Sequence, residues 1–123
     1  MASYGPVNDV FELSEDVATL PAAEVAQQLS VPVSRVSQLV RDGQLLSFRR
    51  AGEVLVPADF LDGGAVVKGL PGTITLLTDA GFSDEEIIDW LYRPDDSLPG
   101  RAIDALRENR GTEVKRRAQV AGF

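Results

Sequence analysis

The chain contains no cysteine and no histidine among its 123 residues. Their absence excludes disulfide bonds, thiolate nucleophiles, zinc fingers and Ser-His-Asp triads. Only two lysines occur, Lys68 and Lys115, and their sequence contexts are unrelated. Neither a GxxxxGK[ST] loop nor a GxGxxG motif after a strand is present, so the sequence gives no support for nucleotide binding. We therefore expect no enzyme activity, no cofactor and no metal site.

Long hydrophobic runs are also missing. No stretch approaches the ~18 apolar residues that a membrane-spanning helix needs, and residues 1–9 lack the charged start and apolar centre of a signal peptide. These features predict a cytoplasmic protein that does not bind a membrane. The hydrophobic content of 44% is sufficient for the core of one ordinary domain or two very small ones.

Positive charge is in deficit, because the formal net charge is −7. Residues 1–29 hold five acidic residues and no basic one, and we expect residues 1–17 to form an acidic flexible arm. Residues 30–56, in contrast, hold four arginines and two acidic residues. Salt screens surface charges beyond about 8 to 10 Å. A basic surface on residues 30–56 can therefore bind phosphates even though the whole chain is acidic.

Residues 20–43 have the pattern of a helix-turn-helix. Apolar residues at three- and four-residue spacing predict a first helix over about 21–29, and Pro32 predicts a break at residues 30–32. A second apolar stripe predicts a second helix over 33–42, and Gly43 can adopt the left-handed conformation that ends it. Two short helices joined by a tight turn are typical of a helix-turn-helix.

The polar face of the second helix suits DNA. It carries no acidic residue and consists of Ser34, Arg35, Ser37, Gln38 and Arg41. These side chains can contact phosphates or donate to base edges. The alternative is an ordinary solvated face on a helix-turn-helix that serves only for packing. The hairpin that follows favours DNA binding.

The segment LLSFRRAGEVLVP predicts a β-hairpin with its turn at Ala51-Gly52. Arg49 and Arg50 lie beside the tip, where a wing meets the minor groove or flanking phosphates. A short helix is expected to begin at Pro57 and to end at Gly63-Gly64. We therefore predict that residues 18–66 form a winged helix-turn-helix with a two-stranded wing.

The remaining residues, 67–123, predict a helical module. One helix is expected over about 70–81, and a capping box of Ser83 and Glu86 opens a second. A third is expected around residues 102–106, and Thr112 is expected to cap a fourth. The predicted fold class is mainly α, a winged helix-turn-helix with a two-stranded β-hairpin wing plus a C-terminal helical module.

The order of these motifs resembles a known family. The run from Leu20 to Gly43, followed by RRAG at 49–52 and by Val56-Pro57, resembles the excisionase and MerR-like winged helix-turn-helix. Within that class, residues 18–123 resemble the small winged-helix DNA-binding proteins of mycobacteria and other actinobacteria. The resemblance implies DNA binding. We therefore predict a non-catalytic transcriptional regulator that binds double-stranded DNA, with the helix at 33–42 in the major groove. The residues that the resemblance implicates are Ser34, Arg35, Ser37, Gln38 and Arg41, with Arg49 and Arg50 in support.

Two further partners follow from resemblance. Some of these actinobacterial proteins are substrates of a Ser/Thr protein kinase, although the short arm here does not match a phosphorylation site in a longer tail. The stretch FSDEEIIDWLYRPDDSLPGRAIDALRENRGTEV also resembles the partner-binding C-terminal domain of toxin-neutralising antitoxins, with Ala102 where those domains usually have Pro. This implies a module for homodimerisation or partner binding. The alternative function is a protein-interaction adaptor with a vestigial or docking winged helix.

Other side chains have a structural and a functional interpretation. Asp84, Glu85, Glu86 and Asp89 suggest a metal site or paired carboxylates, but acidic residues in the first turn of a helix are favoured by its dipole. Trp90 is expected in the core. A basic group could contact phosphates, although a solvated surface is the favoured interpretation. Its members are Arg107, Arg110, Lys115, Arg116 and Arg117.

Overall fold

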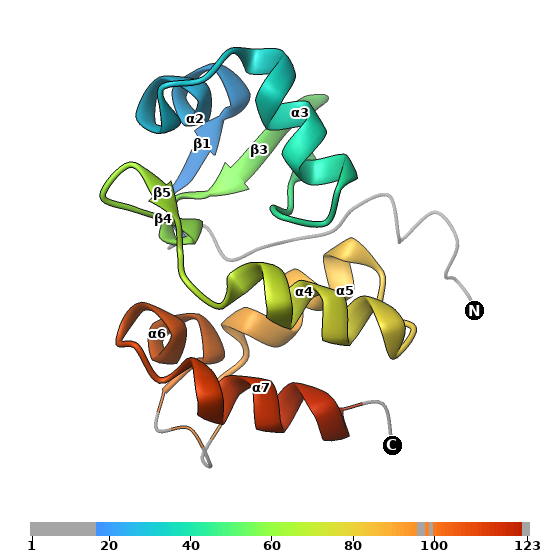
Figure 1. Cartoon of the computed structure of the whole chain (residues 1–123). Helices are drawn as coiled ribbons and strands as arrows, with labels where there is room; N and C mark the ends of the chain where they lie inside the picture. The colour runs from blue at the N-terminus through green and yellow to red at the C-terminus, as the bar shows by residue number, and fades with distance from the viewer. Residues whose placement is uncertain (1–16, 96–97, 99, 122–123) are drawn as a thin grey trace, which may run out of the picture.

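The helix-turn-helix and the sheet form one half of the molecule, and four helices form the other (Figure 1). The computed structural model describes residues 17–95, 98 and 100–121. The first half contains β1 (Thr19–Pro21), α2 (Ala22–Leu29), α3 (Val33–Arg41), β2 (Phe48–Arg50), β3 (Glu53–Pro57), the 3-10 helix η1 (Ala58–Phe60), β4 (Leu61–Asp62) and β5 (Ala65–Val66). The second contains α4 (Leu70–Asp79), α5 (Asp84–Tyr92), α6 (Ala102–Arg107) and α7 (Gly111–Val120). None of the described helices has the length and hydrophobicity that crossing a bilayer requires.

The wing has a third strand that the sequence did not predict. The expected hairpin of β2 and β3 is present, but β1 pairs antiparallel with the other side of β3, which gives the order β1-β3-β2. Leu20 of β1 lies opposite Val56. A strand of three residues is too short to show alternation, and Pro21 gives a signal for a helix start. Pro21 is in fact the N-cap residue of α2, so the two-stranded expectation is incomplete.

The segment expected as one short helix from Pro57 to Gly63-Gly64 is also different. After η1 the chain forms a β-hairpin of the two-residue strands β4 and β5, in which Leu61 pairs with Val66. Gly63 and Gly64 have φ angles of 60° and 89°, the positive values that the tightest hairpin turns require. The prediction of a helix up to Gly63-Gly64 was therefore wrong, because the two glycines favour a turn.

The C-terminal half confirms the expected helical content. The capping box that opens α5 is present, since the Ser83 hydroxyl accepts from the Glu86 N–H at 3.2 Å and the Glu86 carboxylate accepts from the Ser83 N–H at 2.8 Å. The prediction that Thr112 caps α7 was wrong. Arg110 is the N-cap residue, because Asn109 turns the chain with a φ of 65° and the helix resumes at Gly111.

Polar and aromatic contacts join the two halves over one shared hydrophobic core. The Phe60 and Tyr92 rings stack with their centroids 6.2 Å apart, and the Tyr92 hydroxyl donates to Asp59 Oδ2 at 3.0 Å. Arg107 Nη1 donates to the main-chain carbonyls of Asp59 at 2.9 Å and Leu61 at 2.8 Å. The helix-turn-helix is thus fixed to the C-terminal helices through the segment around η1.

Candidate nucleic-acid interface

The turn between α2 and α3 sets the direction of the second helix. Ser30 has a φ of 58°, in the left-handed region, and the Val31 N–H donates to the Ala26 carbonyl at 3.0 Å. Pro32 then takes the N-cap position of α3 with a φ of −67°. The chain therefore reverses within residues 30–32, and the predicted break is confirmed.

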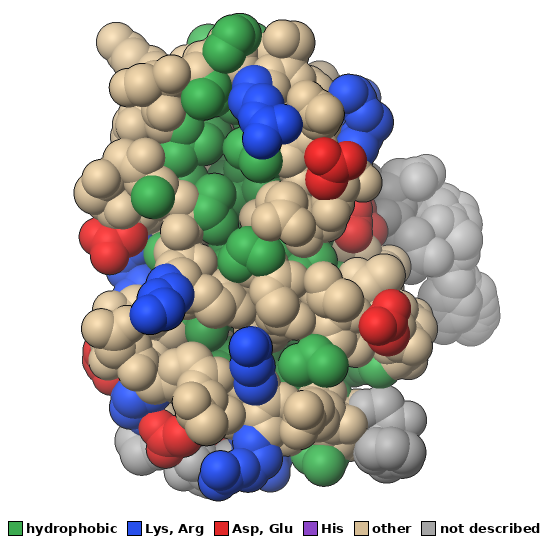
Figure 2. Space-filling model, in the orientation of Figure 1, with side chains coloured by type: hydrophobic (Ala, Val, Ile, Leu, Met, Phe, Trp, Pro, Cys, Tyr) green, Lys and Arg blue, Asp and Glu red, His purple; other side chains and the backbone are tan. Residues whose placement is uncertain are grey.

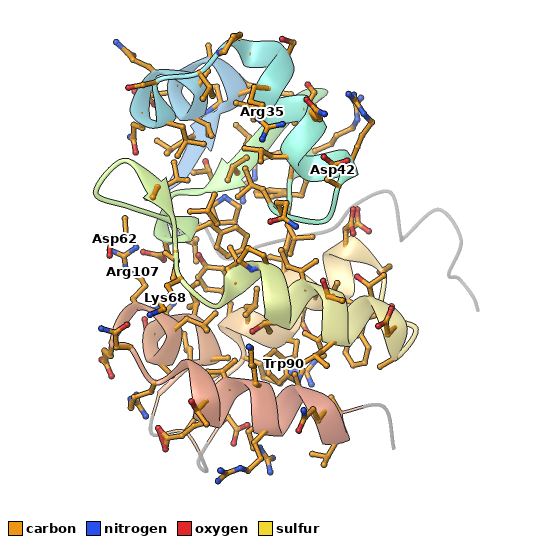
Figure 3. The ribbon with its side chains drawn as sticks, in the orientation of Figure 1. Arg35, Asp42, Asp62, Lys68, Trp90 and Arg107 are labelled. Carbon is orange, nitrogen blue, oxygen red and sulfur yellow. The ribbon has the colours of Figure 1, made fainter. Side chains whose placement is uncertain are left out.

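Helix α3 buries one face and exposes the other. Val36 is only 2% exposed, while Leu39 and Val40 are half-buried against the core. The polar face that the sequence predicted is exposed to solvent, and Figure 3 shows Arg35 projecting from α3. Its members are Ser34, Arg35, Ser37, Gln38 and Arg41.

The C-terminal end of α3 has one acidic residue. The helix ends at Arg41, one residue earlier than expected, and Asp42 follows as its C-cap residue. Gly43 has a φ of 73°, which confirms the predicted left-handed position, and the Gln44 N–H donates to the Leu39 carbonyl at 2.9 Å. Asp42 is exposed and lies at the end of α3 in Figure 3. Its carboxylate therefore sits directly after the cationic face.

The two wing arginines lie on opposite faces of β2, because successive side chains of a strand alternate. Arg49 is exposed, and its partner across the hairpin is Val54. Arg50 is half-buried, with its guanidinium carbon 5.4 Å from the centre of the Phe48 ring. Arg49 is therefore displayed to solvent, whereas Arg50 is held against the hairpin.

Ion pairing separates the basic side chains into two groups. Five arginines of the C-terminal half, Arg93, Arg101, Arg107, Arg110 and Arg117, make ion pairs or hydrogen bonds within the protein. Within residues 17–95, 98 and 100–121, no such partner engages Arg35, Arg41, Arg49, Lys68, Lys115 or Arg116. Figure 2 shows Lys and Arg side chains on both halves of one face. The first three cations without a partner lie on α3 and β2, where DNA binding was predicted.

The other predicted groups are explained by structure. Asp84, Glu85 and Glu86 occupy the first turn of α5, and no cluster of metal-ligating side chains occurs in the part of the chain that is described. Trp90 is half-buried against the core and also lines a hollow of about 430 Å³ together with Arg117. In the basic group, Arg107, Arg110 and Arg117 have protein partners, whereas Lys115 and Arg116 have none among the residues that the structure describes.

Comparisons with known proteins give matches to both halves of the chain. A family model described as "DNA-binding protein Rv2175c, wHTH domain" matches residues 6–61, and one described as "Rv2175c C-terminal domain of unknown function" matches residues 67–122. The chain is similar to DNA-binding protein Rv2175c of Mycobacterium tuberculosis (strain ATCC 25618 / H37Rv), with 42% identity over 129 aligned residues. That alignment covers 94% of this chain and 87% of the relative. The NMR structure of Rv2175c matches with a TM-score of 0.83, covering 90% of this chain and 85% of that one.

Proposed function

Because the chain belongs to the Rv2175c family of winged helix-turn-helix proteins, we propose that it is a non-catalytic DNA-binding protein that regulates transcription. The observation that carries the proposal is the exposed face of α3, which holds Arg35 and Arg41 without any protein partner among the described residues. A helix-turn-helix presents such a face to the major groove.

Each part of the interface has a proposed task. Ser34, Arg35, Ser37, Gln38 and Arg41 contact base edges and phosphates in the major groove. Arg49 contacts the minor groove or a flanking phosphate, and Arg50 supports the hairpin through Phe48 and reaches DNA from the other face of β2. We propose that DNA binding belongs to residues 18–66, and that residues 67–123 form a homodimerisation or partner-binding module.

Affinity is expected to depend steeply on salt. One chain offers on the order of four to six phosphate contacts, and each contact contributes about 0.9 to the slope of log K against log salt. A single winged unit of this size therefore needs a second copy or an adjacent site for specificity. The homodimer, a Ser/Thr protein kinase as a further partner, and a cytoplasmic location remain proposals.

The test of this function is a mobility-shift assay. DNA fragments selected from a random pool by the full chain serve as the probe at two salt concentrations. Arg35→Ala and Arg41→Ala should each weaken binding by about five- to tenfold at low salt and reduce the salt slope by about one. Arg116→Ala is the matched control, because Arg116 is exposed and lies on α7.

Two results would contradict the proposal. The first is an unchanged affinity for both arginine variants at low salt. The second is selection of no DNA by the full chain together with retention of a protein partner, which would favour the adaptor. Helical circular dichroism of each variant would show that the fold is intact.

A further inference from the structure

A small hollow in the C-terminal half brings together the two lysines of the chain. It has a volume of about 230 Å³ and is lined by Lys68, Gly69, Asn109, Gly111, Thr112 and Lys115. We call it the lysine hollow. Lys68 and Lys115 are far apart in the sequence, with 46 other residues between them. The packing of α4 against α7 places both at one site.

The Lys115 side chain lies over a glycine of the neighbouring helix. A Cβ atom at Gly72 of α4 would lie 3.1 Å from Lys115 Cε and 3.6 Å from Lys115 Nζ. The end of the Lys115 side chain therefore crosses α4 at Gly72, the residue of the first helical turn that has no side chain. A larger residue at position 72 would displace the ammonium group.

Two other glycines, Gly69 and Gly111, line the hollow and lie close to each other. A Cβ atom at Gly69 would lie 3.1 Å from Leu106 Cδ2 and 3.9 Å from the Cα of Gly111. Gly69 has a φ of 89°, which an L side chain rarely adopts. The backbones of the α4 start and the α7 start therefore approach each other closely, between Lys68 and Lys115.

The lining of the hollow favours an anion. Its described lining residues include two lysines, one asparagine and one threonine, and none of them is acidic. Neither lysine has an ion-pair or hydrogen-bond partner in the described part of the chain. The first N–H groups of α7 are at Gly111 and Thr112, and N–H groups at a helix start add to the attraction for an anion.

The size of the hollow limits the anion. Sites for drug-sized ligands measure about 300–1,000 Å³, and the lysine hollow is smaller. We propose that it binds a single phosphate group, supplied either by the DNA backbone or by a small phosphorylated molecule. Lys68 is exposed, and in the view of Figure 3 it lies on the same face of the molecule as Arg35. The proposal does not depend on DNA binding by α3.

Inorganic phosphate is the first probe. The full chain is titrated with it at constant ionic strength and pH 7.5, and the amide NMR signals of Gly69, Gly111 and Thr112 are followed. We expect chemical shift changes that saturate. In Lys115→Gln the dissociation constant for phosphate should be two- to fivefold larger, as expected when one exposed pair of opposite charges is removed. Arg116→Gln, the control on the next residue of α7, should bind phosphate as the unchanged protein does. Equal dissociation constants in all three proteins, or no saturation up to about 100 mM phosphate, would overturn the proposal.

Gly72→Ala tests the geometry without changing the charge. The methyl group should displace the Lys115 ammonium and weaken phosphate binding, but by less than Lys115→Gln does, because the positive charge is retained. Lys115 is flexible and its contacting atoms lie near the end of the side chain, so the variant should fold. An unchanged dissociation constant in this variant would contradict the role assigned to Gly72 and Lys115.

A DNA duplex distinguishes the two sources of phosphate. If the group belongs to DNA, a duplex bound by the protein should shift the same three amides, and Lys115→Gln should reduce the salt slope by about one. If it belongs to a small molecule, inorganic phosphate should still shift these amides at saturating DNA, with the salt slope unchanged. If α3 does not bind DNA, the Arg35→Ala variant will bind DNA as tightly as the unchanged protein does. The phosphate titration will not be affected by this result, so each proposal can fail without the other.

Discussion

Tyr92 and Asp59 form a side-chain hydrogen bond between the two halves. Burial, and then the charge of Asp59, raise the pKa of the Tyr92 hydroxyl above its ordinary value of about 10. The folded protein therefore keeps a proton that the unfolded chain loses above about pH 10. The stabilisation from this hydroxyl is fully present below that pH and is lost as the pH rises further.

Tyr92→Phe should expose this linkage. The variant keeps the ring that stacks on Phe60 but removes the donor to Asp59, and we expect it to unfold about 1 kcal/mol more easily at pH 7. The difference in the free energy of unfolding between the two proteins should be smaller at pH 10.5. At that pH the Tyr92 hydroxyl of the unfolded unchanged protein begins to lose its proton, which lowers the stability of that protein, whereas the variant has no hydroxyl at this position. Urea unfolding at both pH values measures this difference. A difference that grows with pH would contradict the assignment.

Asp42 is the acidic residue closest in sequence to the cationic face of α3. An acidic group at a helix C-terminus is disfavoured by the helix dipole, and here it also repels phosphates. Asp42→Asn should therefore raise the free energy of unfolding by about 0.3–1 kcal/mol and strengthen DNA binding by about two- to threefold at low salt. Thermal unfolding and the mobility-shift assay measure the two effects. Weaker DNA binding in this variant would place Asp42 among the base contacts.

At the scale of elements, the wing has a strained turn. Ala51 and Gly52 have φ angles of 53° and 79°, as a tight hairpin turn requires, and the first of these values is unfavourable for alanine. Ala51→Asn should raise the free energy of unfolding by about 0.5–1 kcal/mol, because Asn tolerates this conformation. Ala51→Val should lower it. Thermal denaturation of both variants measures these changes in stability. If the Asn variant were less stable than the unchanged protein, the Ala51 side chain would make a contact that matters more than the backbone strain.

The elements that the sequence predicted well are those with local causes. The capping box of α5 and the turn at Gly43 depend on hydrogen bonds and backbone angles within a few residues. Strand β1 and the β4–β5 hairpin were missed because their pairing partners are distant or their strands have two or three residues. The start of α7 was misplaced, because the left-handed Asn109 sets it and Thr112 does not.

The same division applies to the candidate sites. The exposed face of α3 could be predicted, because helical periodicity alone separates Arg35 and Arg41 from the buried Val36. The lysine hollow could not, because it arises from the packing of α4 on α7. The donation from Arg107 to two distant carbonyls likewise has no signal in the sequence. A possible signal was the pair of glycines, Gly69 and Gly72, that flank the start of α4.

At the scale of the whole molecule, the shared core predicts cooperative unfolding. Leu46 lies in the core of the N-terminal half, while Trp90, the single tryptophan, lies in the other half. Leu46→Ala should remove about 2–5 kcal/mol of stability and shift the Trp90 fluorescence transition as far as the circular dichroism transition. A fluorescence midpoint that stays in place while circular dichroism shifts would show that the halves unfold separately.

In the part of the chain that the structure describes, the strand order β1-β3-β2 places β1 and β2 at the two edges of the sheet. Proline on one edge and arginines on the other are residues that discourage a foreign strand from joining a sheet. The charge on β2 thus protects solubility, in addition to the nucleic-acid contact that we propose for it. A relative of this protein that no longer bound DNA would still be selected to keep a charged side chain at position 49. Conservation of that charge among relatives would therefore be weak evidence for a regulatory role.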